Sequence, residues 1–290
     1  DLLQKTRPKD WVVLELSSFQ LQDLADSNLK SLGRPEIAAI TNLYKDHLNW
    51  HGNFKNYTRA KSYLTYFQNK SNYLFLGSAD KNLKRISQIS RARIFFSNLS
   101  PNLKKTVVRN LGSHYVSSVA PAVEIAKILG VGQKSIKKVL DNFRGLQGRQ
   151  EKITEIKGVK FINDTTSTVP EATVAALERF CKLKPKNSKI VLIAGGQDKN
   201  LHYKTLAKTI RRKADTLILL PGTATKKLKK ELKAGNYEEV GSMNEAVKKA
   251  YAKAKRGDYV LLSPGAASFV IFLNEFNRGK KFIEAVKKLK

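Results

Sequence analysis

The chain has little cysteine and no long apolar run, and these absences exclude several classes of protein. Its one cysteine, Cys181, cannot form an internal disulfide or a cysteine-based zinc site. No apolar stretch reaches the roughly 18 residues that a membrane span needs, and no signal-peptide pattern opens the chain. Apolar residues make up 41% and charged residues 27% of the 290 residues, a globular composition. We expect a cytoplasmic protein of two domains with no membrane partner.

Acidic residues are also scarce, which gives the chain a strong positive charge. Lys and Arg number 54 against 24 Asp and Glu, a formal net charge of +30. Such a balance attracts anions, including nucleic acid and phosphorylated substrates. The lysines are spread along the chain, with the densest runs at 226–230 and 248–256, so they also fit a general enrichment of solvated helix faces. Charge alone leaves both interpretations open.

Two further absences concern methionine and phosphate-binding loops. The only methionine is Met243, and the chain opens on Asp1 shortly before an apolar run. This predicts a piece of a longer protein whose N-terminal part is missing. The 290 residues contain neither G-x-x-x-x-G-K-[ST] nor G-x-G-x-x-G, so any nucleotide site predicted from them is incomplete.

What is present is an alternation of strand-like and helix-like segments, which predicts an α/β fold with parallel sheets. The first half is predicted to hold strands at 11–16, 36–42, 72–76 and 93–97, and helices at 53–68, 117–129 and 133–143. After a hinge-like segment at 144–149, strands are predicted at 152–156, 159–163, 189–194, 216–220 and 258–262. Helices are predicted at 170–180, 203–211, 225–232 and 244–255, with a last helix after 268.

Three residues of the first half are candidates for metal chemistry. Glu15 ends the first predicted strand, where a carboxylate faces the ligand crevice and suits Mg²⁺, although it could simply cap the next turn. His47 follows Asp46, and an imidazole beside a carboxylate suits a metal ligand with its orienting group, or a structural loop. Lys61 lies on an otherwise apolar helical stripe. It either reaches the edge of that stripe or reacts with CO₂ to give an anionic carbamate that holds a metal.

In the second half, polar turns follow three predicted strands. They are Asn163–Thr168, Gly195–Lys199 and Ser263–Ser268. Hydroxyl groups and a lysine after a strand suit a carboxylate or a phosphate, although each turn alone could be purely structural. Three such turns at equivalent topological positions favour one shared ligand site.

Several of these strings together resemble the Mur ligases, most closely the branch that adds D-glutamate. They are LELSSFQL (14–21), NLYKDHLNWH (42–51), YTRAKSYLTY (57–66), GLQGRQE (145–151), INDTTSTVPEAT (162–173), AGGQDK (194–199) and LLSPGAASF (261–269). They occur in the order of the family and span nearly the whole chain. ELSSFQL and the SP-x-x-AS string are specific to this branch.

The resemblance implies a domain arrangement and a reaction. Residues 1–148 would form part of a central P-loop-type ATPase domain with a mostly parallel sheet, and residues 149–290 a C-terminal Rossmann-like domain. The UDP-binding domain and the phosphate loop would lie in the missing N-terminal part, so this fragment alone would be inactive. In the family, ATP phosphorylates UDP-N-acetylmuramoyl-L-alanine, and the D-glutamate amine attacks the acyl phosphate. The expected setting is cytoplasmic peptidoglycan precursor synthesis by a monomer.

The resemblance also implies roles for individual residues. Glu15, His47 and a carbamylated Lys61 would bind Mg²⁺ and serve catalysis. Ser17 and Gln20 would face the muramoyl substrate, and Arg149, Asp164 and His114 would contact ATP. Lys199, Ser268 and Phe269 would hold D-glutamate, with Thr165 close by. The chain departs from the family at Tyr115 and Ser118, where asparagines usually contact the adenine, and at Thr166, where many members have lysine.

Two alternative functions stay open. One is another ligase of the Mur or folylpolyglutamate type. The other is an inactive, basic, nucleic-acid-binding remnant, which only the charge of +30 favours. The sequence has no interleaved aromatic and basic motif typical of nucleic-acid modules, so we expect no specific nucleic-acid partner.

Overall fold

A computed structural model describes residues 3–27, 34–78, 80–233 and 237–289. The chain divides into two compact units, residues 1–43 with 51–96, and residues 44–50 with 97–290. Among the described helices, none combines the length and apolar character that a bilayer span requires.

The first unit is built on a three-stranded sheet in the order β1 (Ile37–Ile40), β2 (Tyr73–Gly77) and β3 (Arg93–Ser97). Strands β1 and β2 are parallel, as predicted. The other elements are η1 (Leu3–Lys5), α1 (Ser18–Asp26), α3 (Phe54–Ser62), η2 (Tyr63–Thr65) and α4 (Leu83–Ile89), and α2 (Leu48–His51) lies at the boundary between the units. The core joins Leu74 and Leu76 of β2 to Ile86 of α4 and Tyr57 of α3.

The strand predicted at residues 11–16 is wrong. The run has no regular secondary structure, and Val13 is 92% exposed and Leu14 69%. A short apolar run forms a strand only where another strand pairs with it. In the described part of the chain, the sheet of this unit ends at β1 and β3.

The second unit begins with a group of helices, α5 (Pro101–Asn110), η3 (Ser113–Tyr115), α6 (Val116–Ile128) and α7 (Gln133–Asn142). They pack around Val107, Val123 and Ile136. Helices α6 and α7 confirm the prediction, whereas α1, α4 and α5 were not predicted. Pro101 occupies the first turn of α5, where its missing N–H leaves no bond unmade.

A six-stranded sheet follows, in the order β4-β5-β9-β6-β7-β8. Its strands are β4 (Glu151–Ile156), β5 (Val159–Asn163), β6 (Ile190–Gly195), β7 (Thr216–Leu220), β8 (Tyr237–Glu239) and β9 (Tyr259–Leu262). The first two form an antiparallel hairpin through Lys157 and Gly158, and the remaining pairs are parallel. The α/β architecture with parallel strands is therefore confirmed.

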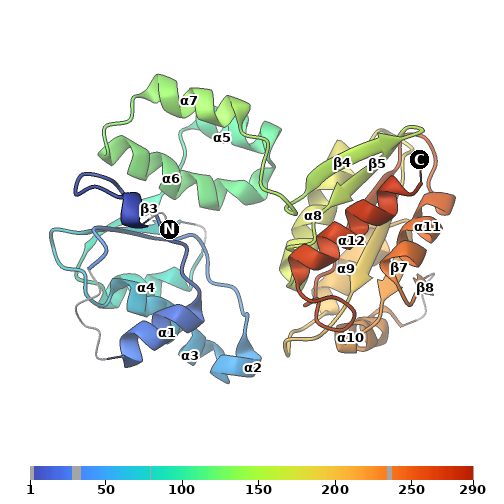
Figure 1. The fold of residues 1–290 in the computed structure, drawn as a ribbon, viewed down its shortest axis with the longest axis horizontal. Helices are drawn as coiled ribbons and strands as arrows, with labels where there is room; N and C mark the ends of the chain where they lie inside the picture. Colours follow the sequence, from blue (N-terminus) through green and yellow to red (C-terminus); the bar gives the residue numbers. More distant parts are fainter. Residues whose placement is uncertain (1–2, 28–33, 79, 234–236, 290) are drawn as a thin grey trace. The chain divides into compact units, whose positions relative to one another are not determined.

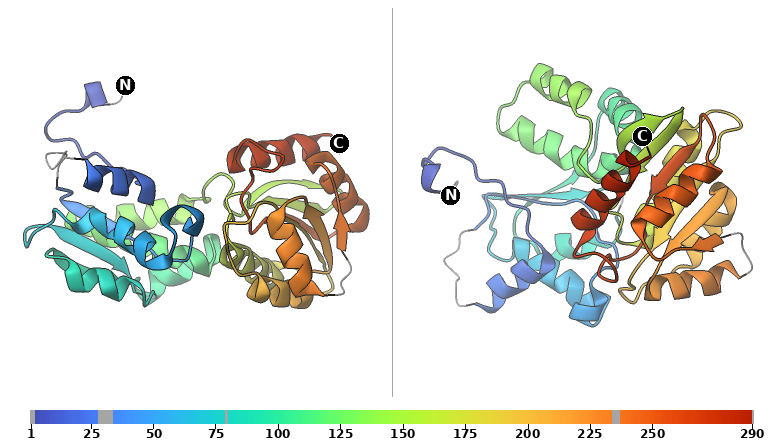
Figure 2. Two further views of the ribbon diagram at one scale, coloured as in Figure 1. Left: turned by 90° about the horizontal axis from the view of Figure 1, so that it is seen from below. Right: turned by 45° about the vertical axis from the view of Figure 1, so that its right-hand side comes forward.

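Helices cover both faces of this sheet (Figures 1 and 2). One face packs against α8 (Pro170–Leu183), α9 (Lys204–Lys213) and α10 (Thr223–Leu232). The other packs against α11 (Met243–Lys253) and α12 (Glu275–Lys287). The chain leaves β5 and β6 toward the first face but leaves β9, which lies between them, toward the second. Such reversals open a crevice at the carboxyl ends of the strands, where α/β folds bind ligands.

Candidate functional site

The three polar turns predicted as one site are joined at the carboxyl ends of β5, β9 and β6. The Asp164 carboxylate accepts hydrogen bonds from Ser167 Oγ at 2.5 Å and Ser263 Oγ at 2.7 Å. Gln197 and Ala267 form an antiparallel bridge with N–O distances of 2.9 and 3.0 Å. Residues about 100 positions apart in sequence therefore build one surface.

Gly196 makes the approach of two of these turns possible. A Cβ atom there would lie 2.3 Å from the Ala267 carbonyl oxygen, and its φ of 140° is outside the range that L side chains favour. Gly196 therefore allows a close contact between the backbones of the two turns.

Asp164 is buried, and its environment changes its acidity. Burial raises the pKa to about 7, opposed by the hydrogen bonds from Ser167, Ser263 and the Gln150 N–H and by the charge of Arg149. Each pKa unit corresponds to about 1.36 kcal/mol of preference between the two forms. This carboxyl group therefore changes its charge near neutral pH, which suits a site that accepts a hydrogen bond or a proton.

The three predicted nucleotide contacts, His114, Arg149 and Asp164, fall in one cluster. Burial lowers the pKa of His114 to about 4, and the charges of Arg179 and Arg149 act in the same direction. The imidazole is therefore neutral at pH 7. Arg179 was not predicted, and it donates to Gln150 Oε1 at 3.0 Å. An arginine within an amphipathic helix carries no motif that would have identified it.

The departures at Tyr115 and Ser118 have different structural consequences. Tyr115 is buried, its ring lies 4.6 Å from that of His114, and its hydroxyl donates to the Arg149 carbonyl at 3.4 Å. It thereby fastens the start of α6 to the Arg144–Arg149 segment. Ser118 is exposed. Neither side chain offers a carboxamide to a base.

The residues predicted to hold D-glutamate differ in their availability. Lys199 Nζ lies 3.0 Å from Asp46 Oδ1 and 3.4 Å from Thr168 Oγ1. Ser268 Oγ is buried and, among the described residues, has no hydrogen-bond partner. Phe269 is 62% exposed. Lys199 and Ser268 therefore present polar atoms that a ligand could use, and Thr168, from the predicted Asn163–Thr168 turn, lies beside Lys199.

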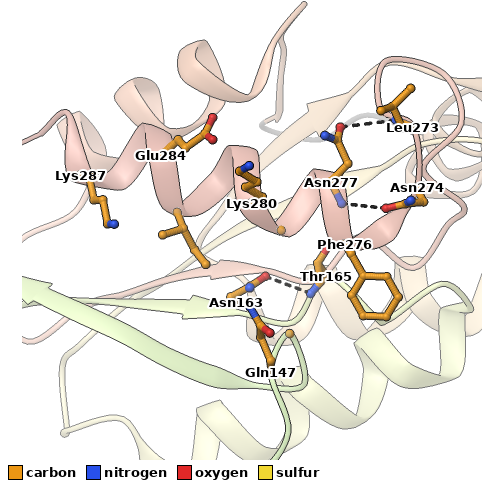
Figure 3. Close-up of a pocket in the computed structure, with 13 residues that line it drawn as sticks. Gln147, Asn163, Thr165, Leu273, Asn274, Phe276, Asn277, Lys280, Glu284 and Lys287 are labelled. Atoms are coloured by element: carbon orange, nitrogen blue, oxygen red, sulfur yellow. Dashed lines mark hydrogen bonds between the residues drawn. The ribbon is translucent and has the colours of Figure 1, made fainter. Parts of the chain in front are cut away.

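Thr165, by contrast, uses its hydroxyl within the protein. Its Oγ1 donates to the Glu275 carbonyl at 2.7 Å and accepts from Arg278 Nε at 3.2 Å. Its side chain also lines a cavity of about 590 Å³ together with Asn163, Gln147 and one face of α12 (Figure 3). Carboxamides, lysines and the Phe276 ring surround this cavity, so it can accept both polar and apolar groups.

In the first unit, Ser17 and Gln20 bond to each other across the start of α1. Ser17 Oγ accepts from the Gln20 N–H at 3.2 Å, and Gln20 Oε1 accepts from the Ser17 N–H at 2.9 Å. This reciprocal capping box fixes the beginning of the helix. Glu15 stands just before it and is exposed. The two residues predicted to face the muramoyl substrate thus also have a local structural role.

Lys61 lies on α3, half-buried, next to a histidine whose role was not predicted. His51 is buried, its Nε2 lies 2.9 Å from Ser18 Oγ, and its ring stacks on Phe19 at 5.5 Å. Burial lowers the pKa of His51, and the positive charge of Lys61 lowers it further. The Lys61 helix and the ELSSFQ segment therefore face each other within this unit.

His47 lies against the carboxylate of Asp46, which precedes it in sequence. Its Nε2 lies 3.4 Å from Asp46 Oδ2, and its N–H donates to Asp46 Oδ1 at 2.8 Å. Glu15 and Lys61 belong to the first unit and His47 to the second. In the described part of the chain, no three His, Cys, Asp or Glu side chains gather as a metal site. The Glu15, His47 and Lys61 set stays a prediction that depends on a carbamate at Lys61.

Comparison with known proteins identifies two domain families along the chain. The Mur ligase middle domain matches residues 2–132, and the Mur ligase glutamate ligase domain matches residues 148–265. Proteins named UDP-N-acetylmuramoylalanine–D-glutamate ligase, from Caldanaerobacter subterraneus and Ligilactobacillus salivarius, are 34% and 33% identical. The matches cover 98% and 99% of this chain but only 65% and 64% of those relatives.

Solved structures share the fold at lower identity. A MurF ligase from Thermotoga maritima in complex with ADP matches with a TM-score of 0.64 and 14% identity, over 90% of this chain and 65% of that one. The FolC protein of E. coli in complex with DHPP and ADP matches with a TM-score of 0.62 and 17% identity, over 88% and 62%. At these identities the likeness establishes the fold alone.

Proposed function

The chain belongs to the Mur ligase family, and from that premise we propose that it forms the middle and C-terminal domains of an ATP-dependent ligase. The ligase would join D-glutamate to UDP-N-acetylmuramoyl-L-alanine through an acyl phosphate, as a monomer, in cytoplasmic peptidoglycan precursor synthesis. The observation that carries this proposal is that three polar turns meet at the carboxyl ends of β5, β9 and β6. The relatives that bear this enzyme name match the chain over these turns and nearly all of the rest.

The amino-acid substrate would bind at Lys199 and Ser268. D-Glutamate carries two carboxylates, and an ammonium and a hydroxyl group are natural donors to them. Lys199 Nζ already bonds Asp46, so it is positioned for a carboxylate oxygen. Ser268 Oγ is buried without a partner in the described part, and an unbonded buried hydroxyl is costly unless a ligand completes it. Phe269 would border the site.

ATP would be contacted by Arg149, Asp164 and His114. Arg149 is exposed and carries the charge that phosphate oxygens require. Asp164 suits a hydroxyl donor such as a ribose group, because the carboxylate is an acceptor once ionised. With Tyr115 committed to the Arg149 carbonyl, the base would be held through shape and stacking rather than through carboxamides.

Mg²⁺ would be held by Glu15 and His47, with a carbamate on Lys61 as a further oxygen donor. The donor chemistry fits a hard cation only in part, because a carboxylate and an imidazole alone make a weak Mg²⁺ site. When bound, the ion neutralises phosphate charge. Asp46 holds His47 in orientation, and the Ser17–Gln20 cap fixes the backbone that follows Glu15.

A phosphate-release assay on the complete gene product tests the proposal. With ATP, Mg²⁺ and UDP-N-acetylmuramoyl-L-alanine, we expect release that depends on D-glutamate and not on L-glutamate or L-lysine. Lys61→Ala should lower the rate by about 100-fold or more, the usual loss when a charge-stabilising group is removed. The matched control is Lys55→Ala, an exposed lysine on the same helix.

Three outcomes would contradict the proposal. Absence of phosphate release with every amino acid argues against ligase activity. Release with L-glutamate and a folate acceptor instead assigns the chain to a folylpolyglutamate-type reaction. Equal rates for Lys61→Ala and Lys55→Ala remove Lys61 from the catalytic set.

A further inference from the structure

Arg278 on α12 is a fully buried charged side chain. Its exposed fraction is 0%, and it is the largest side chain among the fully buried residues described. Its guanidinium donates to the Thr165 carbonyl at 2.7 Å, to Thr165 Oγ1 at 3.2 Å and to the Ala266 carbonyl at 3.0 Å. These three partners are neutral oxygens, and the carboxylates of Glu275 and Asp164 act on Arg278 through their charge.

The three bonds join two of the turns that build the candidate site. Thr165 lies in the turn after β5, and Ala266 lies in the turn after β9, so one planar group spans both. Ala267, the next residue, bridges to Gln197 and so links the third turn, which carries Lys199. Ser268, with its unpartnered buried hydroxyl, follows directly. Arg278 thus contacts the backbone of two turns, next to the residues that carry the candidate ligands for the amino acid.

The buried charge adds an electrostatic effect. Burial lowers the pKa of Arg278 to about 10, and the nearby Glu275 and Asp164 oppose this change, so the group stays charged at pH 7. Its three hydrogen-bond partners carry no charge, so the buried cation also attracts an anion bound nearby. A dicarboxylate substrate would supply that anion, whereas an uncharged amino-acid side chain would not.

The geometry points to Arg278 as a positioning residue that sets the affinity of this site for an acidic amino acid, by holding the turns after β5 and β9 in register and by supplying buried positive charge. This inference rests on the proposed function for its substrate. A lysine would keep the charge but lose the planar fork that reaches both turns. Arg278→Lys and Arg278→Met therefore separate the two contributions.

The first measurement is steady-state kinetics of the complete gene product. We expect the KM for D-glutamate to rise about 10- to 100-fold in Arg278→Lys, because the turns that carry the candidate ligands lose their shared support and a small displacement of a binding group has an effect of this size. The rise should be larger in Arg278→Met, while the KM for ATP changes less than about twofold. Lys281→Met, an exposed neighbour on α12, is the control. Added guanidinium ion should partly restore Arg278→Ala, an effect that general damage to the fold would not give.

The second measurement reports on the turns directly and does not depend on activity. The Gly265 N–H donates to the Ser167 carbonyl at 2.9 Å, so it connects the same two turns. Hydrogen exchange of this amide should accelerate in Arg278→Lys and Arg278→Met, whereas exchange in the centre of β6 should not.

The outcomes are distinguishable. If exchange is unchanged in both variants, the tie between the turns is refuted. If exchange accelerates but the KM for D-glutamate stays at the wild-type value, the tie is structural only and the positioning role is refuted. If the wild-type protein itself shows no D-glutamate-dependent reaction, the proposed function fails and Arg278 has no role in acidic amino-acid affinity, whatever the exchange shows. Faster exchange together with a selective rise in KM supports the inference.

Discussion

Asp164 shows how burial changes the chemistry of a single residue. Its pKa is about 7 in the folded protein, against 3.8 for an ordinary aspartate, chiefly because burial disfavours the charged form. Between these two values the folded state binds a proton that the unfolded state has already lost. The stability of the wild-type protein therefore decreases as the pH rises through this window.

We predict that Asp164→Asn removes this pH dependence. Relative to the variant, the wild-type free energy of unfolding should fall by on the order of 4 kcal/mol between pH 4 and pH 7 and stay level above it, at about 1.36 kcal/mol per pKa unit. Urea unfolding of both proteins at several pH values measures this difference.

Asp198→Asn is the contrasting control. Although burial opposes the change, the hydrogen bonds from Lys227, Leu201 and Tyr203 lower the pKa of Asp198. Its contribution is therefore lost as the pH falls below the usual range of an aspartate. A flat difference between wild type and Asp164→Asn would contradict the raised pKa of Asp164, because the hydrogen bonds and the charge of Arg149 would then balance the effect of burial.

At the scale of an element, α12 approaches the turn after β5 more closely than a side chain would permit. A Cβ atom on Gly279 would lie 2.7 Å from Thr165 Cγ2 and 3.2 Å from Asn163 Nδ2. A glycine inside a helix is unfavourable by roughly 0.5–1 kcal/mol relative to alanine. Its presence therefore indicates that packing against the turn outweighs helix propensity.

We predict that Gly279→Ala destabilises the protein by roughly 1–3 kcal/mol, the usual range for an overpacked core. Gly241→Ala is the matched control, because Gly241 is exposed and a Cβ atom there would lie 4.0 Å from its nearest neighbour, Glu245 Oε2, an ordinary contact distance. That variant should stay within about 0.5 kcal/mol of wild type. Thermal or urea unfolding distinguishes the two, and equal stabilities would mean that α12 can move away from the turn.

The elements that the sequence predicted correctly are those whose pattern is local. The buried runs of β5, β6, β7 and β9 and the apolar stripes of α6 and α7 are readable without knowing their partners. The run at 11–16 has the same local pattern, but no strand pairs with it in the described structure. Whether an apolar run becomes a strand depends on pairing with a distant segment, and the local sequence pattern carries no information about that pairing.

The predicted site residues lie in local sequence motifs, whereas the residues that were missed depend on long-range contacts. The turns after β5, β6 and β9 are short motifs, so Asp164, Lys199 and Ser268 could be proposed from sequence. Arg278 acts on Thr165, 113 residues away, through contacts that only the fold creates. His51 and Arg179 likewise gain their roles from burial and neighbours. A resemblance to a family supplied the roles of the motif residues but not these.

The net charge of +30 belongs to the whole molecule and is not confined to the candidate site. Many lysines pair with acidic residues on the surface, for example Lys127 with Glu124 and Lys249 with Glu245. Exposed pairs of this kind contribute about 0–1 kcal/mol each and leave the excess charge in place. That excess attracts any polyanion through the field of the whole molecule, which is a different property from a built site.

We therefore predict that the protein binds nucleic acid weakly and without preference. In a gel-shift assay, duplexes of unrelated sequence should bind equally at about 50 mM salt. Affinity should fall by roughly 10³-fold or more by about 200 mM salt, because binding through phosphate contacts is driven by the release of counterions. Duplex DNA at physiological salt should leave the D-glutamate-dependent phosphate release unchanged, since most long-range attraction is screened beyond about 8 Å there.

A preference of more than about tenfold for one sequence or structure that persists at the higher salt would instead require base or shape contacts. The alternative of a nucleic-acid-binding protein would then account for the charge better than a ligase does.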